Sequence, residues 1–304
     1  MNLRQLKFED YPKYKLFFND QSHTLCAYSL PSVLAWTNDE YQPFGAVYKD
    51  ALILAAEFQT EKKYRHLILP LRPGHDFSPQ ELCDIAVTSG FDEYWFVPEA
   101  FLKHQGTSDL KARFHVHRHA ELDDYIFLVE DLSLLKGNKF SKKRNLINQF
   151  HRDYVDTGRV DIEPITPNAL DDCLEFLELW CEERKCHEGE DMLLACEKQA
   201  TINTLLNISL FELTGILLRI DGMVSAFGIA APLTRDMAVL QYEKAFSDVK
   251  GLYQYFDGQC AMRLFNGYTY INKESDMGVE GLKKAKKSYH PVKKMRSYRL
   301  VLKK

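Results

Sequence analysis

The sequence predicts an α/β protein of the α+β kind, with two domains in tandem that are each built on a mixed β-sheet. The chain has 304 residues, a length that suits two domains better than one. Strand and helix signals alternate through the first half, and an amphipathic helix followed by an apolar hairpin occurs twice, within residues 10–58 and 169–230. We therefore expect an N-terminal domain over residues 1–135 and a C-terminal domain over residues 136–304.

The first domain is predicted from one hairpin, several short apolar strands and one well-marked helix. The helix covers residues 78–90, where Ser78 is the expected N-cap, Glu81 completes a capping box and Gly90 ends the helix. Strands are expected at residues 44–58 (a hairpin around Lys49–Asp50), 66–71, 93–97 and 123–132. This alternation is typical of a mixed sheet with helices on its faces.

The second domain is predicted to open with a basic helix and to end with a strand. Its strongest turn signal is Asp221–Gly222, which joins two apolar runs into a hairpin. Helices are expected at residues 140–150, 166–184, 193–208, 252–265 and 278–289, and strands at residues 215–233 (the hairpin), 237–246, 268–272 and 297–302.

The net charge of -4 hides two basic segments on an acidic body. Residues 136–152 contain six Lys or Arg residues and residues 281–304 contain ten, with no acidic residue in either; the remainder has 23 basic and 43 acidic residues. Such an uneven distribution favours an anionic partner such as phosphate, RNA or a lipid headgroup. The alternative is that both segments are solvated faces of a helix and a terminal strand, and charge alone does not decide between the two.

Composition also bears on location and on metal binding. The N-terminus lacks the apolar core of a signal peptide and no apolar run is long enough to cross a bilayer, so we expect a cytoplasmic protein. The seven cysteines form no CxxC pair, which argues against a disulfide framework. Cys181, Cys186, His187 and Cys196 lie close in sequence, but structural zinc sites have tighter ligand pairs, and we expect no metal.

The order of the elements in the second half resembles that of the GCN5-related N-acetyltransferases (GNAT). In that fold, backbone amides at a helix N-terminus hold the pyrophosphate of acetyl-coenzyme A. The matching stretch here is EKAFSDVKGLYQYF, residues 243–256, in which Lys250 and Gly251 are the candidate phosphate contacts. The stretch lacks the glycine-rich pattern that coenzyme A binding uses, so we disfavour coenzyme A and expect no required cofactor.

Three segments resemble the C-terminal part of bacterial phosphatidylglycerol lysyltransferases and the proteins grouped with it. They are YIFLVEDLSLLKGNKFSKKRNLINQF (residues 125–150), QYEKAFSDVKGLYQYF (residues 241–256) and YINKESDMGVEGLKKAKKSYHPV (residues 270–292). The resemblance implies two GNAT-like domains in tandem, as in the Fem peptidoglycan aminoacyltransferases. It also implies transfer of an aminoacyl group from aminoacyl-tRNA to an amine or hydroxyl group of a lipid or small molecule.

The candidate site consists of polar residues that follow two expected central strands. Glu243 lies where one strand should end and Asp276 follows the next, at the edge where open α/β sheets bind ligands, and we expect the two to face each other. Aminoacyl transfer needs mainly positioning and electrostatics, so both carboxylates are assigned as acid/base or ammonium-binding groups. The expected substrate-binding residues are Asn272, Glu274, Glu280, Lys244, Lys283 and Tyr253, and the expected phosphate or tRNA contacts are Lys142, Lys143, Arg144, Lys250 and Gly251.

Structural roles for the same residues stay open. Asp276 can be the N-cap of the helix that follows, and Glu280 with Lys284 can form an ordinary i,i+4 pair. The basic helix can serve to dock the two domains through its apolar side. Two other functions also remain, an acyl-CoA N-acyltransferase with a degenerate phosphate loop and a non-catalytic binding module on the same fold. The expected partners are aminoacyl-tRNA or another anionic ligand, with peripheral contact to anionic lipid.

Overall fold

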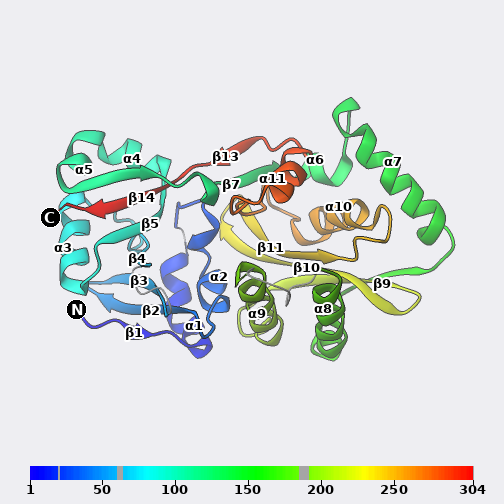
Figure 1. Ribbon diagram of the computed structural model, residues 1–304, viewed down its shortest axis with the longest axis horizontal. Coiled ribbons are helices and arrows are strands. Elements are labelled where there is room, and N and C mark those ends of the chain that lie inside the picture. Colours follow the sequence, from blue (N-terminus) through cyan, green and yellow to red (C-terminus); the bar gives the residue numbers. More distant parts are fainter. Residues whose placement is uncertain (20, 60–63, 185–191, 304) are drawn as a thin grey trace. The chain divides into compact units, whose positions relative to one another are not determined.

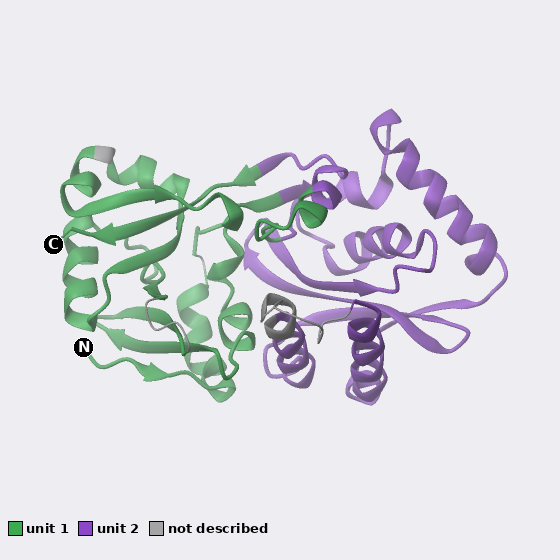
Figure 2. Cartoon of the chain, in the orientation of Figure 1, with its two compact units in different colours: residues 1–125, 274–283, 294–304 green, residues 126–273, 284–293 purple. Residues whose placement is uncertain are grey.

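The computed structural model describes residues 1–19, 21–59, 64–184 and 192–303 of the chain (Figure 1). The chain forms two compact units (Figure 2). Unit 1 contains residues 1–125, 274–283 and 294–304, and unit 2 contains residues 126–273 and 284–293. Each unit is organised around its own seven-stranded mixed sheet.

Unit 1 has a sheet in the order β1-β2-β3-β4-β5-β14-β6, in which β4 and β5 are parallel and the other pairs are antiparallel. Its strands are β1 (Arg4–Gln5), β2 (Tyr41–Tyr48), β3 (Ala51–Phe58), β4 (Arg65–Leu67), β5 (Glu93–Pro98), β6 (Phe114–Arg118) and β14 (Ser297–Leu302). Its α-helices are α1 (Tyr11–Tyr14), α2 (Leu30–Ala35), α3 (Pro79–Ser89), α4 (Glu99–Gln105) and α5 (Thr107–Arg113), with 3-10 turns at Phe8–Asp10, Lys15–Phe18, Cys26–Tyr28 and Ala120–Leu122.

Local sequence signals account for two elements of unit 1. The predicted hairpin is β2–β3, and its turn residues Lys49 and Asp50 both have positive φ, as a two-residue turn of this handedness requires. The predicted helix is α3: the Ser78 hydroxyl accepts from the backbone N–H of Glu81, and the Glu81 carboxylate accepts from the backbone N–H of Ser78. Gly90 ends this helix in the left-handed conformation. All three features confirm the sequence interpretation.

The capping box of α3 provides a first prediction. Replacing Ser78 with alanine removes the acceptor for an N–H group of the first turn, and we expect the free energy of unfolding to fall by about 1 kcal/mol. Chemical denaturation measures the change. Ser108→Ala, on an exposed position of α5, is the control and should stay within about 0.5 kcal/mol of the wild type. Equal effects of the two substitutions would contradict a specific capping role.

Unit 2 has a sheet in the order β13-β7-β12-β11-β10-β9-β8, in which β11 and β12 are parallel. Its strands are β7 (Asp124–Leu128), β8 (Val160–Pro164), β9 (Thr214–Ile220), β10 (Met223–Thr234), β11 (Met237–Ala245), β12 (Tyr270–Asn272) and β13 (Lys293–Met295). Its α-helices are α6 (Val129–Leu134), α7 (Ser141–Phe150), α8 (Leu170–Arg184), α9 (Met192–Leu206), α10 (Leu252–Leu264) and α11 (Glu280–Lys287), with 3-10 turns at Asn138–Phe140 and Pro167–Ala169 and a π-turn at His151–Val155. The first two residues of β7, the start of α11 and the end of β13 belong to unit 1.

Helices cover both faces of the sheet in unit 2. Figure 1 shows α8 and α9 on one side of β10 and β11, and α10 with α6 on the other. The hairpin β9–β10 turns at Asp221–Gly222, where both residues have positive φ, as the sequence predicted. Because β11 is covered on both faces, its residues Met237–Tyr242 are all buried. The core of unit 2 therefore lies on both sides of the strand that carries Glu243 and Lys244.

The two sheets repeat one plan, which agrees with the internal repeat that the sequence suggested. In each, three antiparallel strands (β2-β3-β4 and β9-β10-β11) lead through a helix (α3 and α10) to a strand parallel to the third (β5 and β12). An antiparallel strand then follows on the far side, β14 in unit 1 and β7 in unit 2. The helix expected in residues 10–18 is broken into α1 and a 3-10 turn. The predicted fold class, with a mixed sheet in each half, is confirmed.

Strands β7 and β14 each pair in the sheet of the other half of the chain, so the chain divides differently from the two predicted domains. The sequence placed residues 123–132 in the first domain and residues 297–302 in the second, with a boundary after residue 135. In the structure β7 pairs with β12 of unit 2 through Ile126–Leu128, and β14 pairs with β5 and β6 of unit 1. The compact units consequently differ from the predicted domains, because strand pairing between distant parts of a chain leaves no local signal in the sequence.

Candidate functional site

Of the two parallel strands of unit 2, β11 extends well beyond the end of β12. Pairing joins Met237–Val239 of β11 to Tyr270–Asn272 of β12, and β11 then continues for six more residues to Ala245. The loop of residues 246–251 leads from there into α10. Ligands in open α/β sheets lie beyond the carboxyl ends of parallel strands. The candidate site is therefore the region of unit 2 beyond Asn272 and alongside the end of β11.

A buried ammonium group joins two carboxylates in this region. The Lys273 Nζ atom lies 2.8 Å from Oε2 of Glu243 and 2.7 Å from Oδ1 of Asp257. The side chains of Lys273 and Glu243 are each 13% exposed and that of Asp257 is 4% exposed. Strand β11, helix α10 and the residue after β12 thus supply one charged group each, and two negative charges share one positive charge out of contact with bulk water.

Two further side chains complete this group, which we call the Lys273 cluster: Glu243, Asp257, Lys273, Tyr289 and Lys143. Burial raises the pKa of the Tyr289 hydroxyl, and the charge of the nearby Asp257 carboxylate adds to this effect. The Lys143 ammonium lies 3.9 Å from the centre of the Tyr289 ring, and the Lys273 ammonium lies 5.5 Å from it. Among the described residues no carboxylate lies within ion-pairing distance of Lys143. The basic helix α7 thus carries a half-buried, unpaired cation to the cluster.

Burial and mutual charge set the protonation of the Lys273 cluster. Burial raises the pKa of Glu243 to about 7, helped by the charge of Asp257 and opposed by Lys273. Burial alone would lower the pKa of Lys273, but the charges of Asp257 and Glu243 outweigh it and raise that pKa. Burial lowers the pKa of Lys143, although the charge of Asp257 acts in the opposite direction. A carboxyl group that titrates near neutral pH, beside a fixed cation, is suited to general acid–base chemistry.

The raised pKa of Glu243 predicts a pH dependence of stability. Its ordinary pKa is 4.5 and its folded value is about 7, so the folded protein binds the proton more tightly than the unfolded chain does. The stability that this group contributes is full below about pH 4.5 and is lost as the pH rises through about 7. The loss amounts to about 3 kcal/mol at most.

Denaturant titrations at a series of pH values measure this change. We expect the free energy of unfolding to fall with rising pH in the wild type and to fall by clearly less in Glu243→Gln, which cannot titrate at this position. Parallel curves for the two proteins would show that Glu243 has an ordinary pKa in the folded state.

Gly251, an expected phosphate contact, packs against α7. A Cβ atom at this position would lie 2.3 Å from the backbone oxygen of Leu146 and 3.0 Å from Cβ of Phe150. Gly251 also has a φ of +86°, a conformation that side chains other than glycine rarely adopt. The Phe150 ring lies 4.9 Å from that of Tyr255 on α10. The apolar side of α7 therefore packs on α10, within unit 2. Because α7 comes so close to the start of α10, residue 251 must be a glycine.

The expected phosphate contacts on α7 have three different environments. Arg144 donates to the backbone oxygens of Leu135 and Gly137, at 2.7 Å for the latter, and so holds the turn before the helix. Lys142 is exposed, and Lys143 belongs to the Lys273 cluster. Lys250, in the loop before α10, is exposed as well. The structure therefore leaves the two lysines of α7 and Lys250 available to an anionic ligand, while Arg144 has a structural role.

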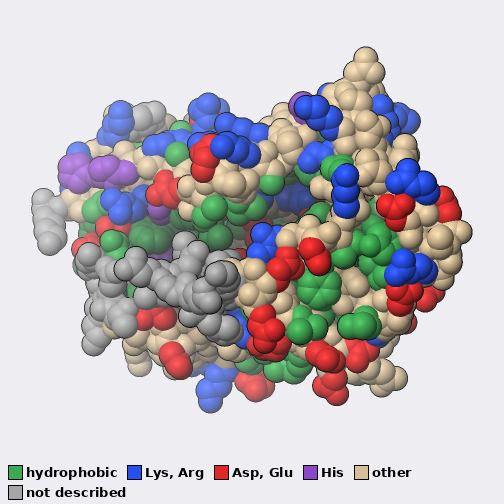
Figure 3. Space-filling model, turned by 45° about the vertical axis from the view of Figure 1, so that its right-hand side comes forward, with side chains coloured by type: hydrophobic (Ala, Val, Ile, Leu, Met, Phe, Trp, Pro, Cys, Tyr) green, Lys and Arg blue, Asp and Glu red, His purple; other side chains and the backbone are tan. Residues whose placement is uncertain are grey.

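The two basic segments meet in unit 2. The Nε2 atom of His290 lies 3.2 Å from the backbone oxygen of Lys139, and the imidazole ring packs against the ring of Phe140. Exposed lysines follow on both segments, at residues 139, 142, 284, 287 and 293. Figure 3 shows Lys and Arg side chains gathered toward the top of its right-hand part, where α7 lies. The segments form one basic surface next to the Lys273 cluster.

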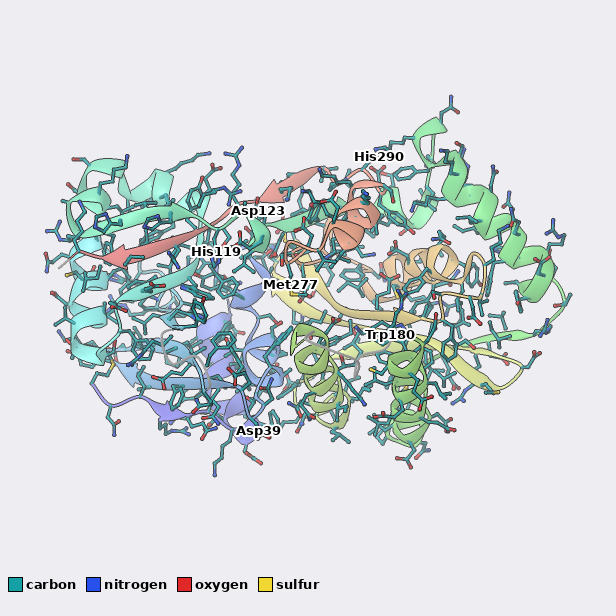
Figure 4. The ribbon with its side chains drawn as sticks, in the orientation of Figure 1. Asp39, His119, Asp123, Trp180, Met277 and His290 are labelled. Carbon is teal, nitrogen blue, oxygen red and sulfur yellow. The ribbon has the colours of Figure 1, made fainter. Side chains whose placement is uncertain are left out.

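Lys244 and Tyr253 lie together, on the other side of β11 from Glu243. The Lys244 ammonium forms an ion pair with Glu197 and lies 4.2 Å from the centre of the Trp180 ring. The Trp180 indole N–H donates to the Tyr253 hydroxyl over 3.3 Å (Trp180 is labelled in Figure 4). Adjacent residues of a strand point to opposite faces, so Lys244 faces α8 and α9. The structure brings these two expected residues to each other but not to the Lys273 cluster.

Asp276, the second expected catalytic residue, belongs to unit 1. Its carboxylate accepts hydrogen bonds from the Tyr125 hydroxyl and from the backbone N–H of Gly278, and Lys294 lies 4.0 Å away. Burial alone would raise the pKa of Asp276, but these hydrogen bonds and the Lys294 charge hold it below its usual value. Its observed contacts are those of a residue that fixes the turn before α11. Glu243 lies in unit 2, so the expectation that the two carboxylates face each other stays a prediction.

The other residues expected around Asp276 lie at the end of β12 and the start of α11. Asn272 is fully buried in register with Ile126 and Val239. Glu274 has a φ of +57°, and its backbone oxygen accepts from the N–H of Tyr125. Glu280 and Lys283 form a partly exposed pair at 3.5 Å, so the expected pair with Lys284 is replaced by an i,i+3 pair.

Sequence reasoning missed Asp257, Lys273 and Tyr289. Asp257 lies between buried residues of α10, and a charged residue on the apolar side of a helix is the signal that could have identified it. Lys273 lies between Asn272 and Glu274, inside the polar run after β12, but it is a lysine among residues whose carboxylate and amide groups suggested the site. Tyr289 is half-buried and packs on Lys143, and the charge of Asp257 acts on its hydroxyl.

Within residues 1–19, 21–59, 64–184 and 192–303, no group of three or more His, Cys, Asp or Glu side chains is placed to hold a metal ion. Cys186 and His187 lie outside the described residues, as does the side chain of Cys196. None of the helices in the described part of the chain combines the length and the apolar character that crossing a bilayer requires.

Known proteins share sequence or fold with this chain. The family model for the C-terminal region of phosphatidylglycerol lysyltransferase matches residues 100–301, about two thirds of the chain. The chain belongs to this family. The match includes all five residues of the Lys273 cluster. None of the curated proteins matches the chain.

Two solved structures share the fold of this phosphatidylglycerol lysyltransferase family member. A conserved protein of unknown function from Bacteroides thetaiotaomicron has 29% identity and a TM-score of 0.87, covering 100% of both chains. The C-terminal domain of a putative lysylphosphatidylglycerol synthetase from Agrobacterium fabrum has 15% identity and a TM-score of 0.66, covering 96% of this chain and 91% of that one. Membership of this family indicates an acyltransferase related to phosphatidylglycerol lysyltransferases.

Proposed function

We propose that this family member transfers an aminoacyl group from aminoacyl-tRNA to an amine or hydroxyl group of a lipid or small molecule, and that the Lys273 cluster is the reaction site. The observation that carries the proposal is the position of α7. This helix packs on the loop where a GNAT enzyme would hold coenzyme A, and it also carries Lys143 to the buried carboxylates.

The packing around Gly251 argues for a donor other than coenzyme A. A pyrophosphate held by the backbone amides at the start of a helix needs free space in front of them. Here the backbone of α7 approaches Gly251 so closely that even one added carbon atom would clash with Leu146. A donor anchored elsewhere by its phosphates suits this arrangement better. The basic surface next to the Lys273 cluster offers such anchoring, because contacts between lysines and RNA phosphates need no particular sequence.

The chemistry required of the cluster is modest, because an aminoacyl ester is already activated. The acceptor N–H or O–H gives its proton to the Glu243 carboxylate as the acceptor atom forms a bond to the ester carbonyl carbon. The bond from that carbon to the ribose oxygen of the tRNA then breaks, and the leaving oxygen takes a proton from the Lys143 ammonium. Lys273 holds Glu243 and Asp257 in place through its two ion pairs. A carboxyl pKa of about 7 and a lowered lysine pKa suit these two proton transfers.

The name of the matching family supports an anionic lipid as the acceptor, since it specifies phosphatidylglycerol. The exposed lysines at residues 139, 142, 284, 287 and 293 would attract such a headgroup as well as tRNA. Both kinds of attraction weaken as salt is added. We therefore expect the apparent affinity for charged tRNA to fall with ionic strength.

The decisive experiment offers the purified chain total tRNA charged with radiolabelled amino acids, with and without phosphatidylglycerol vesicles. We expect label to leave the tRNA and appear in the lipid or in a small acceptor, with at least a hundredfold slower transfer in Glu243→Gln. Glu175→Gln, on an exposed position of α8, is the matched control and should keep the wild-type rate. Transfer from an acyl-CoA thioester but not from tRNA would refute the proposed donor, and no transfer from either would favour a binding module.

A further inference from the structure

A second polar cluster lies in unit 1, away from the residues assigned to transfer. His66 on β4 is 1% exposed, and its ring stacks on that of Trp95 on β5, with centroids 4.3 Å apart and planes 4° from parallel. The His119 ring packs edge-on against the Trp95 ring, with centroids 5.1 Å apart. We call His66, Trp95 and His119 the aromatic–histidine cluster.

Each imidazole of this cluster has one nitrogen atom that forms no hydrogen bond with the described residues. Nδ1 of His66 and Nδ1 of His119 are buried, and no hydrogen-bond partner among the described residues reaches either atom. Burial lowers the pKa of His66 to about 3, and burial also lowers that of His119, so both rings are neutral at physiological pH. Nε2 of His119 lies 3.4 Å from the Glu121 carboxylate, which can only accept, so this nitrogen carries the proton and Nδ1 is left as an acceptor. A buried acceptor without a donor is unfavourable and calls for a ligand that supplies one.

The surroundings favour an uncharged planar ligand. Four more aromatic rings surround the cluster and remain partly exposed: Tyr41, Phe58, Tyr64 and Phe96. Charged groups of both signs border the cluster: Trp95 donates to Glu93 at 2.8 Å and Glu121 lies beside His119, while Arg299 pairs with Glu93 and both Arg118 and Arg299 act on His119. These charges oppose one another and leave no clear excess for a charged ligand, whereas a flat heterocycle can stack on the rings.

The backbone next to Trp95 is held in an unusual conformation. Phe96 has a φ of +55°, which is uncommon for an aromatic residue and unfavourable by about 1–2 kcal/mol. The Tyr28 hydroxyl donates to the Phe96 backbone oxygen over 3.2 Å and accepts from the N–H of Leu69, so it ties β5 to the chain that follows β4. Strain of this kind, held in place by surrounding contacts, is found preferentially at ligand-binding positions.

We propose that the aromatic–histidine cluster binds a purine base, whose exocyclic amine donates to the free imidazole nitrogen while its ring stacks on the aromatic side chains. The base could be that of a free nucleoside or the terminal base of an RNA strand. This assignment goes beyond the transfer reaction, because the residues involved belong to unit 1 and none of them takes part in the proposed chemistry.

Binding of adenosine, measured by calorimetry and by tryptophan fluorescence, tests the assignment. His66→Phe keeps the stacked ring but removes both nitrogens, and Trp95→Leu removes the stacking partner. We expect each to weaken binding about tenfold or more, the range that loss of base stacking or of a polar contact gives. His115→Phe, on an exposed position of the edge strand β6, is the control and should bind as the wild type does.

A short RNA that ends in adenosine distinguishes the two sources of the base. Binding of this RNA but not of free adenosine, with the same sensitivity to His66→Phe, assigns the site to an RNA end. A readout on the unaltered protein guards against misfolded variants: adding the ligand should shift the ¹⁵N resonance of Nδ1 in His66 or His119. The assignment is overturned if neither probe binds, or if binding leaves those resonances unchanged and survives His66→Phe.

Discussion

Lys273→Met should abolish aminoacyl transfer and lower the free energy of unfolding by about 3–5 kcal/mol, as breaking a buried ion pair generally does. The substitution keeps the length and the apolar stem of the side chain and removes only the ammonium. Glu243 and Asp257 would then remain buried beside each other with no compensating charge. At least one of them must take up a proton to fold, which removes the base that the proposed reaction needs.

Two comparisons make this result specific. Lys283→Met removes a lysine whose partner, Glu280, is exposed, and we expect a change within about 0.5 kcal/mol. A triple variant with Lys273→Met, Glu243→Gln and Asp257→Asn leaves no stranded charge, so it should regain most of the lost stability without regaining transfer. Denaturant titration and the charged-tRNA assay measure the two effects separately. Wild-type stability in Lys273→Met would mean that the two carboxylates are not buried together as the structure has them.

The contrast between Glu243 and Lys273 shows what the sequence could predict about the site. Glu243 was predicted because a strand pattern ends at that residue, and strand ends are local features. Lys273 and Asp257 become important only because a residue after β12 and one on α10 meet the same carboxylate. Their separation along the chain is 16 residues, and nothing in the spacing indicates the contact. Lys143 was predicted for its charge, but its position over Tyr289 could not be.

The same limit applied to the fold. The capping box of α3 and the turns at Lys49–Asp50 and Asp221–Gly222 were predicted correctly, because neighbouring residues determine them. The place of β14 was not, although its strand character was, because its partners β5 and β6 precede it by about 180 residues or more. Gly251 is an instructive case between the two. The sequence analysis gave it the role of a phosphate contact, which stays a prediction, and the structure adds that the Leu146 carbonyl of α7 leaves no room for a side chain there.

Gly251→Ala should lower the free energy of unfolding by about 3 kcal/mol, from two sources that add. An alanine at a φ of +86° is strained by about 1–2 kcal/mol. Its Cβ atom would also lie 2.3 Å from the Leu146 backbone oxygen, so α7 must move, and such overpacking generally adds 1–3 kcal/mol, or roughly 2 here. Because Lys143 is on α7, the shift should also withdraw its ammonium from Tyr289 and weaken binding of charged tRNA.

Gly258→Ala is the matched control, since this glycine lies in the middle of α10 with ordinary backbone geometry. Its added Cβ atom would meet only the Leu132 backbone oxygen at 3.7 Å, and alanine is the better helix former by about 1 kcal/mol, so this variant should be as stable as the wild type or more so. Thermal or denaturant unfolding of both variants, with charged-tRNA binding alongside, measures the difference. If Gly251→Ala unfolds at the wild-type midpoint, α7 can leave the start of α10 at little cost. The loop before α10 would then be open to a pyrophosphate, and the case for a donor other than coenzyme A would lose its support.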